Sequence, residues 1–289
     1  MIKNSWLAAG ASCLAVAALA AASAHPAAAS NSKYAGLITL GYSYTDIDVN
    51  NGGIGNVSVN TFIGSGAVDY NVEGNYFAQL DFAFASHSPD SGKTGGISLS
   101  LDTWTAGGTF FWRDPSVGML GVDLAYQSAD IGISGDGLRA GLRGEYYVNN
   151  RVTIGAAVGW EELDFHGLTR ADGWYANAQV KYYVSDKTSL SLNANYYTAD
   201  INNAPFDTNQ WSVGLEGEYL ISRETPVSVY AGVRYGDFNI DNLSNDPTDW
   251  TAYVGLKFRF GNDGGSLADQ DRNGALSPTT TGAAEPFQM

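Results

Sequence analysis

The segment from Trp250 to Phe260 has two faces that need different surroundings. Side chains of a β-strand alternate between its two sides, so every second residue shares a face. One face is apolar along its whole length, and it comprises Trp250, Ala252, Val254, Leu256, Phe258 and Phe260. Aromatic residues stand at both ends of this face with aliphatic residues between them, which is typical of a strand anchored at two membrane interfaces. We therefore expect a strand with lipid on one side and water or polar groups on the other.

Similar alternation recurs along the chain, with no helical periodicity between the segments. The composition agrees, because Gly (35), Tyr (17) and Trp (7) are abundant and only 16% of residues are charged. The second segment is the least regular, since Phe62 and Ile63 fall on opposite faces. We predict about twelve strands, near residues 34–45, 57–70, 75–86, 98–112, 118–128, 137–147, 152–161, 174–183, 188–198, 209–219, 227–235 and 250–260.

The connections between these segments alternate in length. Short ones lie near 71–74, 113–117, 148–151, 184–187 and 220–226, and longer ones near 46–56, 87–97, 129–136, 162–173, 199–208 and 236–249. Each unpaired backbone group in hydrocarbon costs several kcal/mol, so the first strand must pair with the last. The sequence therefore predicts an all-β fold, a closed up-and-down antiparallel transmembrane β-barrel of about 12 strands with short periplasmic turns. A soluble β-sandwich would have to scatter the aromatic residues that here gather near both ends of the strands.

The two ends of the chain differ from the barrel segment 30–260. Residues 1–29 combine a basic start, an apolar middle and small residues, which indicates a signal peptide cleaved after Ala24 or Ala29. The single cysteine lies in this segment, so no disulfide is expected in the exported chain. Residues 261–289 lack alternation, and we expect a disordered periplasmic tail.

Few residues in the chain suggest reaction chemistry or metal binding. The tail contains the first half of a calcium-loop pattern at Asp269, Asp271 and Asn273, but Thr280 stands where the closing Glu would be. His87 has serine neighbours that point to the opposite face of a strand, and His166 lies among acids near an outer rim. No nucleotide-binding, hydrolase or metalloprotease motif is present, and no basic patch for nucleic acid. We therefore expect no enzyme, no cofactor, no metal site and no nucleic-acid partner.

Charges are sorted by position along the predicted barrel. The longer connections and outer strand ends are rich in acids, with only Lys93 and Arg170 opposing them, whereas charges of both signs, including Arg113, balance in the short turns. An acidic outer mouth attracts cations and can share divalent ions with lipopolysaccharide phosphates. Acids and bases on the inward face fall on different strands, which predicts either a field across a water-filled lumen or a plugged interior in which they pair. The inward residues predicted to line a pore are Asp81, Asp123, Arg139, Arg143, Lys181, Glu216, Arg234, Lys257 and Arg259.

The signal segment, the aromatic girdles and the terminal strand ending at Phe260 resemble the bacterial outer-membrane β-barrel (porin) superfamily, and the size resembles its small twelve-stranded channels. The resemblance covers about residues 33–260 and rests on physical patterns rather than on a family-specific motif. It implies localisation in the cell outer membrane of a Gram-negative bacterium, and a role for Phe260 as the signal read by the barrel assembly machinery. Members of the family usually end at this aromatic residue, whereas here a tail follows it.

These patterns favour a passive channel for small hydrophilic solutes or ions with a cation bias. The alternative is a closed structural or adhesion-type barrel that acts through its acidic extracellular loops.

Overall fold

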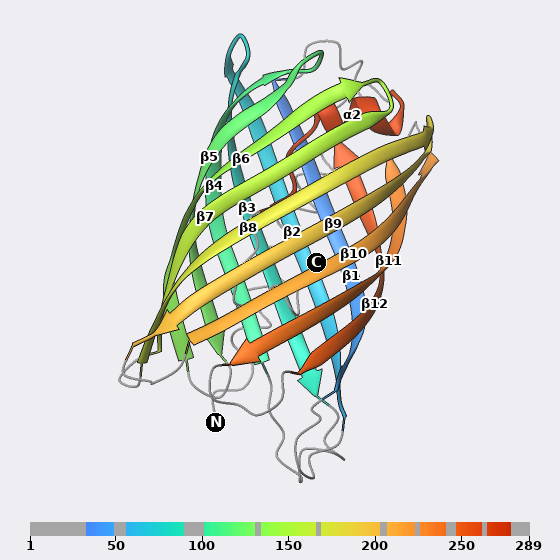
Figure 1. Cartoon of the computed structure of the whole chain (residues 1–289). Helices are drawn as coiled ribbons and strands as arrows, with labels where there is room; N and C mark the ends of the chain where they lie inside the picture. Colours follow the sequence, from blue (N-terminus) through green and yellow to red (C-terminus); the bar gives the residue numbers. More distant parts are fainter. Residues whose placement is uncertain are drawn as a thin grey trace, which may run out of the picture.

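The structure is a computed structural model that describes residues 33–48, 56–89, 101–130, 134–165, 169–202, 207–222, 226–240, 247–261 and 265–278. The predicted signal peptide, His166 and Lys93 lie outside the described residues. Twelve antiparallel strands form one closed barrel (Figure 1). They are β1 (Tyr34–Asp48), β2 (Val57–Glu73), β3 (Tyr76–Pro89), β4 (Leu101–Asp114), β5 (Gly118–Asp130), β6 (Ser134–Asn149), β7 (Val152–Phe165), β8 (Thr169–Ser185), β9 (Thr188–Ile201), β10 (Asp207–Ser222), β11 (Val227–Ile240) and β12 (Thr248–Phe260).

The barrel closes where the first strand meets the last. β1 pairs with β12 from the Gly36–Phe260 pair to the Asp48–Thr248 pair, so neither strand keeps an open edge along this length. Every other strand pairs with its neighbours in sequence. The predicted all-β fold, closure and up-and-down order are confirmed.

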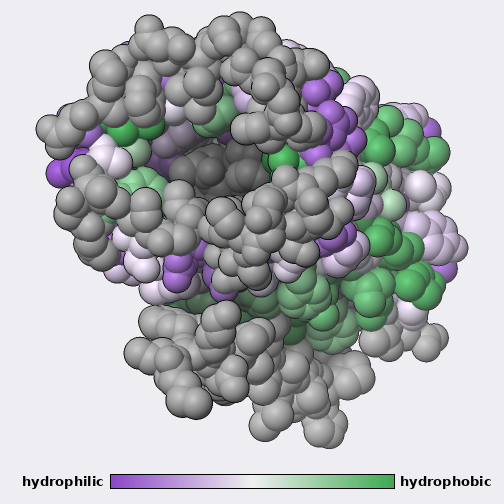
Figure 2. All heavy atoms as spheres, turned by 90° about the horizontal axis from the view of Figure 1, so that it is seen from below, coloured by the Kyte–Doolittle hydropathy of each residue, from purple (hydrophilic) through white to green (hydrophobic). Residues whose placement is uncertain are grey.

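The barrel is apolar outside and polar inside. Leu80 and Leu120 on the outer face are 75% and 63% exposed, whereas Thr61, Gln127 and Glu161 on the inner face are buried. A soluble protein would bury the leucines, so this outer surface requires lipid around it. Figure 2 shows apolar residues on the outer wall of the barrel.

Several strands extend further than the sequence predicts. Trp160 of β7 pairs with Trp174 of β8 in the outer aromatic ring, and the ladder continues past them to the pair Phe165–Thr169. The predicted long connection over 162–173 is therefore wrong for most of its length. Hydrogen bonds between the two strands continue beyond the aromatic ring, where the hydrophobic pattern on which the prediction depended has already ended.

The segment after β12 turns back into the barrel. Gly261 has a positive φ of 81°, and a Cβ there would lie 2.1 Å from the carbonyl oxygen of Tyr34, so only glycine fits this reversal. The helix α2 (Leu267–Asn273) begins at Ser266, whose side chain and that of Asp269 form a capping box. Within the described part of the chain, no helix is long and apolar enough to cross a bilayer.

The prediction of a disordered tail is wrong for residues 265–278, which we call the inner plug. Leu267, Ala268, Gln270 and Leu276 are buried against the inner wall of the barrel. The plug lies at the short-turn end, where the amide of Leu267 donates to the carbonyl of Asp186 at 2.7 Å (Figure 1). Its polar composition suggested a solvated chain, but the barrel interior is itself polar and offers partners for these groups.

Candidate functional site in the barrel lumen

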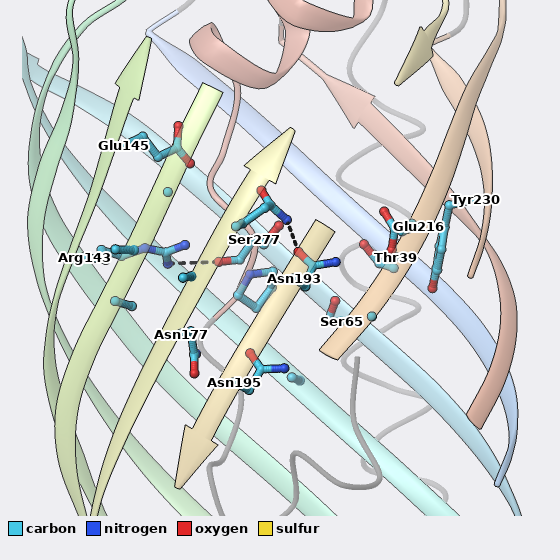
Figure 3. A pocket seen from close by; sticks show the side chains of 18 of the residues that line it. Thr39, Ser65, Arg143, Glu145, Asn177, Asn193, Asn195, Glu216, Tyr230 and Ser277 are labelled. Carbon is cyan, nitrogen blue, oxygen red and sulfur yellow. Dashed lines mark hydrogen bonds between the residues drawn. The ribbon is translucent and has the colours of Figure 1, made fainter. Parts of the chain in front are cut away.

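The barrel lumen contains a cavity of about 330 Å³ whose lining mixes polar side chains with apolar ones such as Ile63 and Met119. Four amide side chains line one wall, from Asn177 and Gln179 on β8 and Asn193 and Asn195 on β9. Glu216 and Tyr230 lie on the opposite side, as Figure 3 shows. The amide of Gln179 donates to Asn193 at 2.7 Å, so the wall is held in place by its own hydrogen bonds. Amides present both donors and acceptors without net charge, which suits contact with water and polar solutes.

The structure brings some of the predicted pore-lining residues to this cavity and places the others elsewhere on the inner wall. Arg143, Glu216, Arg234 and Lys257 border the cavity. Each of the remaining predicted residues is buried, and they lie in polar clusters above or below the cavity: Asp81, Asp123, Arg139, Lys181 and Arg259. All nine side chains face the interior of the barrel, and their role as residues that line a pore stays a prediction.

One cluster forms an ionic network at the short-turn end. Glu218 of β10 contacts Lys181 at 3.2 Å, Lys257 at 3.3 Å and Arg259 at 2.7 Å. Glu216 contacts Lys257 at 2.9 Å. These bases of β8 and β12 therefore pair with acids of the strand between them, as the alternative of paired interior charges predicted, rather than standing unpaired across a lumen.

The inner plug completes this network. Asp271 of α2 contacts Lys181 at 2.5 Å and Arg259 at 2.7 Å, and it accepts a hydrogen bond from the hydroxyl of Tyr183. Burial by itself would raise the pKa of Asp271, but Lys181 and Arg259 outweigh it and hold this pKa below its ordinary value. The three bases are then matched by three acids, Glu216, Glu218 and Asp271.

A second anchor holds the next residue of the plug. The guanidinium of Arg272 lies 4.7 Å from the ring of Tyr147 and 5.6 Å from that of Tyr183. It donates to the carbonyls of Asn149 and Val152 at 2.6 and 3.2 Å and to the hydroxyl of Thr153. Two aromatic faces and several oxygen acceptors match the planar, multiply donating guanidinium of arginine.

A third anchor fixes the end of the plug. The backbone of Leu276 donates to and accepts from the side-chain amide of Gln79, at 2.8 and 3.2 Å. The leucine side chain packs against Phe111 and Met119. Arg143 donates to the carbonyl of Ser277 at 3.0 Å, which places the plug at the boundary of the cavity (Figure 3).

Arg113 belongs to the same region of the lumen, although the sequence placed it in a short turn. It is buried beside Asp69, 3.5 Å away, and lies 4.7 Å from the ring of Phe111. A cation inside a membrane barrel needs such partners, because burial of a charge is otherwise costly. The prediction was wrong because β4 extends to Asp114, beyond the aromatic ring where we expected it to end.

Another cluster lies on the long-loop side of the cavity. The guanidinium of Arg139 stacks on Tyr175 at 3.6 Å, and the hydroxyl of Tyr175 lies 3.4 Å from Asp123. Arg234 contacts Asp249 at 3.3 Å and donates to Thr251 at 3.1 Å. These contacts fix side chains along the wall while leaving the cavity between them.

The predicted assembly residue and the histidines have different surroundings. Phe260 ends β12, and its ring lies over Gly36 of β1, so it covers the seam at which the barrel closes. His87 faces the interior, where its Nδ1 lies 2.8 Å from the hydroxyl of Thr61. No group of metal-ligating side chains occurs among the described residues, and Asp269 and Asp271 of the calcium-loop pattern serve the helix cap and the ionic network.

A family comparison settles the class of protein. The profile of the outer membrane protein β-barrel domain matches residues 14–217. The chain belongs to this family. It is therefore an outer-membrane protein whose strands lie in lipid, as the apolar outer face requires.

Comparisons with solved structures support the same fold. An outer membrane channel from Pseudomonas putida F1 aligns with a TM-score of 0.57 and 11% identity, over 78% of this chain and 95% of that one. The translocator domain of the autotransporter NalP from Neisseria meningitidis aligns with a TM-score of 0.50 and 12% identity, over 87% and 98%. At these identities the likeness establishes the fold alone. No curated protein sequence matches the chain.

The sequence analysis did not predict the inner plug or the residues of the inner wall that hold it. Two signals could have indicated them: the capping pair Ser266 and Asp269, and the leucines Leu267 and Leu276 on either side of an adjacent acid and base. Inward aromatic residues such as Tyr147 and Tyr183 gave no signal, because membrane-facing aromatics dominate the pattern.

Proposed function

We propose that this outer-membrane barrel is a passive channel for small hydrophilic solutes. The observation that supports this best is a cavity of about 330 Å³, lined in part by amide, hydroxyl and charged side chains, inside a barrel whose outer wall is apolar. Its amide and hydroxyl lining can exchange hydrogen bonds with a passing solute without binding it tightly, as conduction requires. A barrel of twelve strands is also wider than one whose interior side chains fill it completely.

A preference for cations follows from the long-loop end. Arg170 is the single base among the described outer strand ends, and it already pairs with Glu162 at 2.9 Å and Asp172 at 3.0 Å. Because acids outnumber bases at this end, they raise the local cation concentration over about a Debye length, roughly 8 Å at physiological salt. The described acids of this end are Asp46, Asp48, Asp102, Asp130, Asp136, Glu161, Glu162, Asp164, Asp172, Asp200, Asp207, Asp237 and Asp249. Two of them have bases of the inner wall beside them, since Glu161 lies opposite Arg139 in the strand register and Asp249 pairs with Arg234.

Two partners complete the proposal. The acids at the outer rim share divalent cations with lipopolysaccharide phosphates, and Phe260 acts as the signal for the barrel assembly machinery from an internal position. The place of Phe260 at the closing seam supports this second role, since strand β12 must be recognised and paired with β1 for the barrel to close.

A closed barrel that acts through its acidic loops is the rival function. The inner plug favours it, because the plug occupies the short-turn end of the lumen. Planar bilayer recordings with ion substitution separate the two. A channel gives discrete conductance steps with a reversal potential on the cation side, whereas silence over many insertions of folded protein would remove the channel.

A further inference from the structure

The inner plug is attached to the barrel in a manner that differs from every strand. Each strand shares a continuous backbone ladder with two neighbours. The plug has no such ladder: among the described residues, one backbone hydrogen bond, from Leu267 to Asp186, joins it to the wall, and its other polar anchors involve side chains. These are the ion pairs of Asp271, the contacts of Arg272 with two tyrosine rings and wall oxygens, and the hydrogen bonds between Gln79 and Leu276. We propose that residues 265–278 form a gate that leaves these sites to open the short-turn end of the lumen. This inference rests on the proposed channel function.

The helix of the plug depends on the wall for its order. α2 spans only Leu267–Asn273, and a helix of that length is not stable alone in water. Once its anchors separate, the segment loses its structure and returns to the flexible chain that its composition suggests. The buried apolar residues of the plug are limited to Leu267, Ala268 and Leu276, and segments with few buried apolar contacts open at a lower free energy than the rest of a fold.

The wall remains satisfied after the plug leaves. Lys181 and Arg259 lose Asp271 but keep Glu218, at 3.2 and 2.7 Å. The backbone carbonyls of Asn149 and Val152 lose Arg272 but gain access to lumen water, which can donate in its place. No charge of the network is therefore left without a partner, and both states of the gate are physically accessible.

Release of the plug changes the net charge of the wall at the short-turn end of the lumen. With the plug docked, Lys181, Lys257 and Arg259 balance Glu216, Glu218 and Asp271. With the plug released, Asp269, Asp271 and Arg272 leave together, which removes one net negative charge, and the bases of the wall network exceed its acids by one. The open channel is thus less cation-selective than the closed one, which gives the gate a signature besides its conductance.

The test uses the full chain in planar bilayers, with an unlatched variant, Asp271→Asn/Arg272→Gln. A matched control, Glu73→Gln/Arg151→Gln, also removes one acid and one base, but from exposed short turns. Wild type should show a main level and rare larger steps with a reversal potential closer to that of anions. The fraction of time spent at the larger conductance level should be at least about tenfold higher in the unlatched variant than in wild type. The control variant should resemble wild type.

A synthetic peptide of residues 265–278, added on the short-turn side, tests directly whether the inner wall binds the plug. It should restore the smaller level in the unlatched variant, whereas a peptide carrying both substitutions should not. Heat-modifiable mobility on gels verifies that each variant is a folded barrel. One fixed conductance level shared by all folded variants, insensitive to peptide, would overturn the gate and leave the channel standing; silence of every variant would overturn both.

Discussion

Glu218 offers the sharpest test of what holds the inner end of the barrel together. Its carboxylate lies within 3.3 Å of Lys181, Lys257 and Arg259, and its side chain is 1% exposed. Glu218→Gln keeps the shape of the side chain and removes its charge, so three buried bases would face only Glu216 and Asp271. The free energy of unfolding should therefore fall.

The magnitude follows from the number of pairs and their burial. At about 3 Å and an effective dielectric constant near 20, each pair attracts by about 5 kcal/mol. Desolvation of several kcal/mol per ion offsets most of this sum in the intact network. When one buried partner is removed, the desolvation of the bases remains and the attraction does not, so a loss of about 3–5 kcal/mol is expected.

Glu216→Gln is the matched control. Glu216 has the same chemistry and lies on the same strand, but it contacts one base, Lys257, and its side chain is 15% exposed at the cavity. Water can replace its contact, so the expected loss is about 1 kcal/mol. Urea unfolding of protein folded into lipid vesicles, followed by tryptophan fluorescence, measures both variants. Equal losses would refute the view that Glu218 organises the three bases.

Three further outcomes are expected from the same structure. Conductance should stay constant from pH 8 to pH 5 and rise only below about 3.9, the ordinary pKa of an aspartate. Docking lowers the pKa of Asp271. The plug is therefore held at full strength above the ordinary aspartate pKa, and its binding weakens as the pH falls through the lowered pKa of docked Asp271. The charged and titratable groups that face Asp271 are Lys181, Tyr183, Glu218 and Arg259. Gly36→Val should reduce the yield of folded barrel several-fold in refolding assays read on gels, because a Cβ at Gly36 would lie 1.9 Å from the ring of Phe260; unchanged yield would show that the seam can rearrange. Replacing Arg143 and Arg234 by Gln should shift the reversal potential further toward cations, because both border the cavity, and an unchanged potential would place them off the ion path.

The barrel could be predicted because lipid leaves so few alternatives. Alternating faces such as that of Trp250–Phe260 identify a strand between lipid and a polar interior, and the need to satisfy every backbone group then requires closure. Even Phe62 and Ile63, which made the second segment ambiguous, fit this scheme, since Phe62 faces lipid and Ile63 is buried inside.

The partners inside the lumen could not be predicted in the same way. Strand alternation shows that Lys181 and Glu218 both face inward, but they lie on β8 and β10, and the sequence does not give the height of one strand relative to another two places away. The tail posed a different difficulty. Charged residues such as Asp271 and Arg272 indicate a solvated segment when no other partner is known. In the structure they lie against a wall that offers complementary charge and aromatic rings.

The charge balance at the inner end explains why a barrel of this width keeps part of its own chain inside. Twelve strands enclose more space than their side chains fill, yet Lys181, Lys257 and Arg259 are held in one narrow region of the wall. Glu216 and Glu218 leave these bases one acid short, and Asp271 supplies it from the plug. The plug can also leave, because Glu218 contacts each of the three bases and remains in the wall when Asp271 is gone. A wall that is neutral with the plug and weakly basic without it has the electrostatic properties that a reversible closure requires.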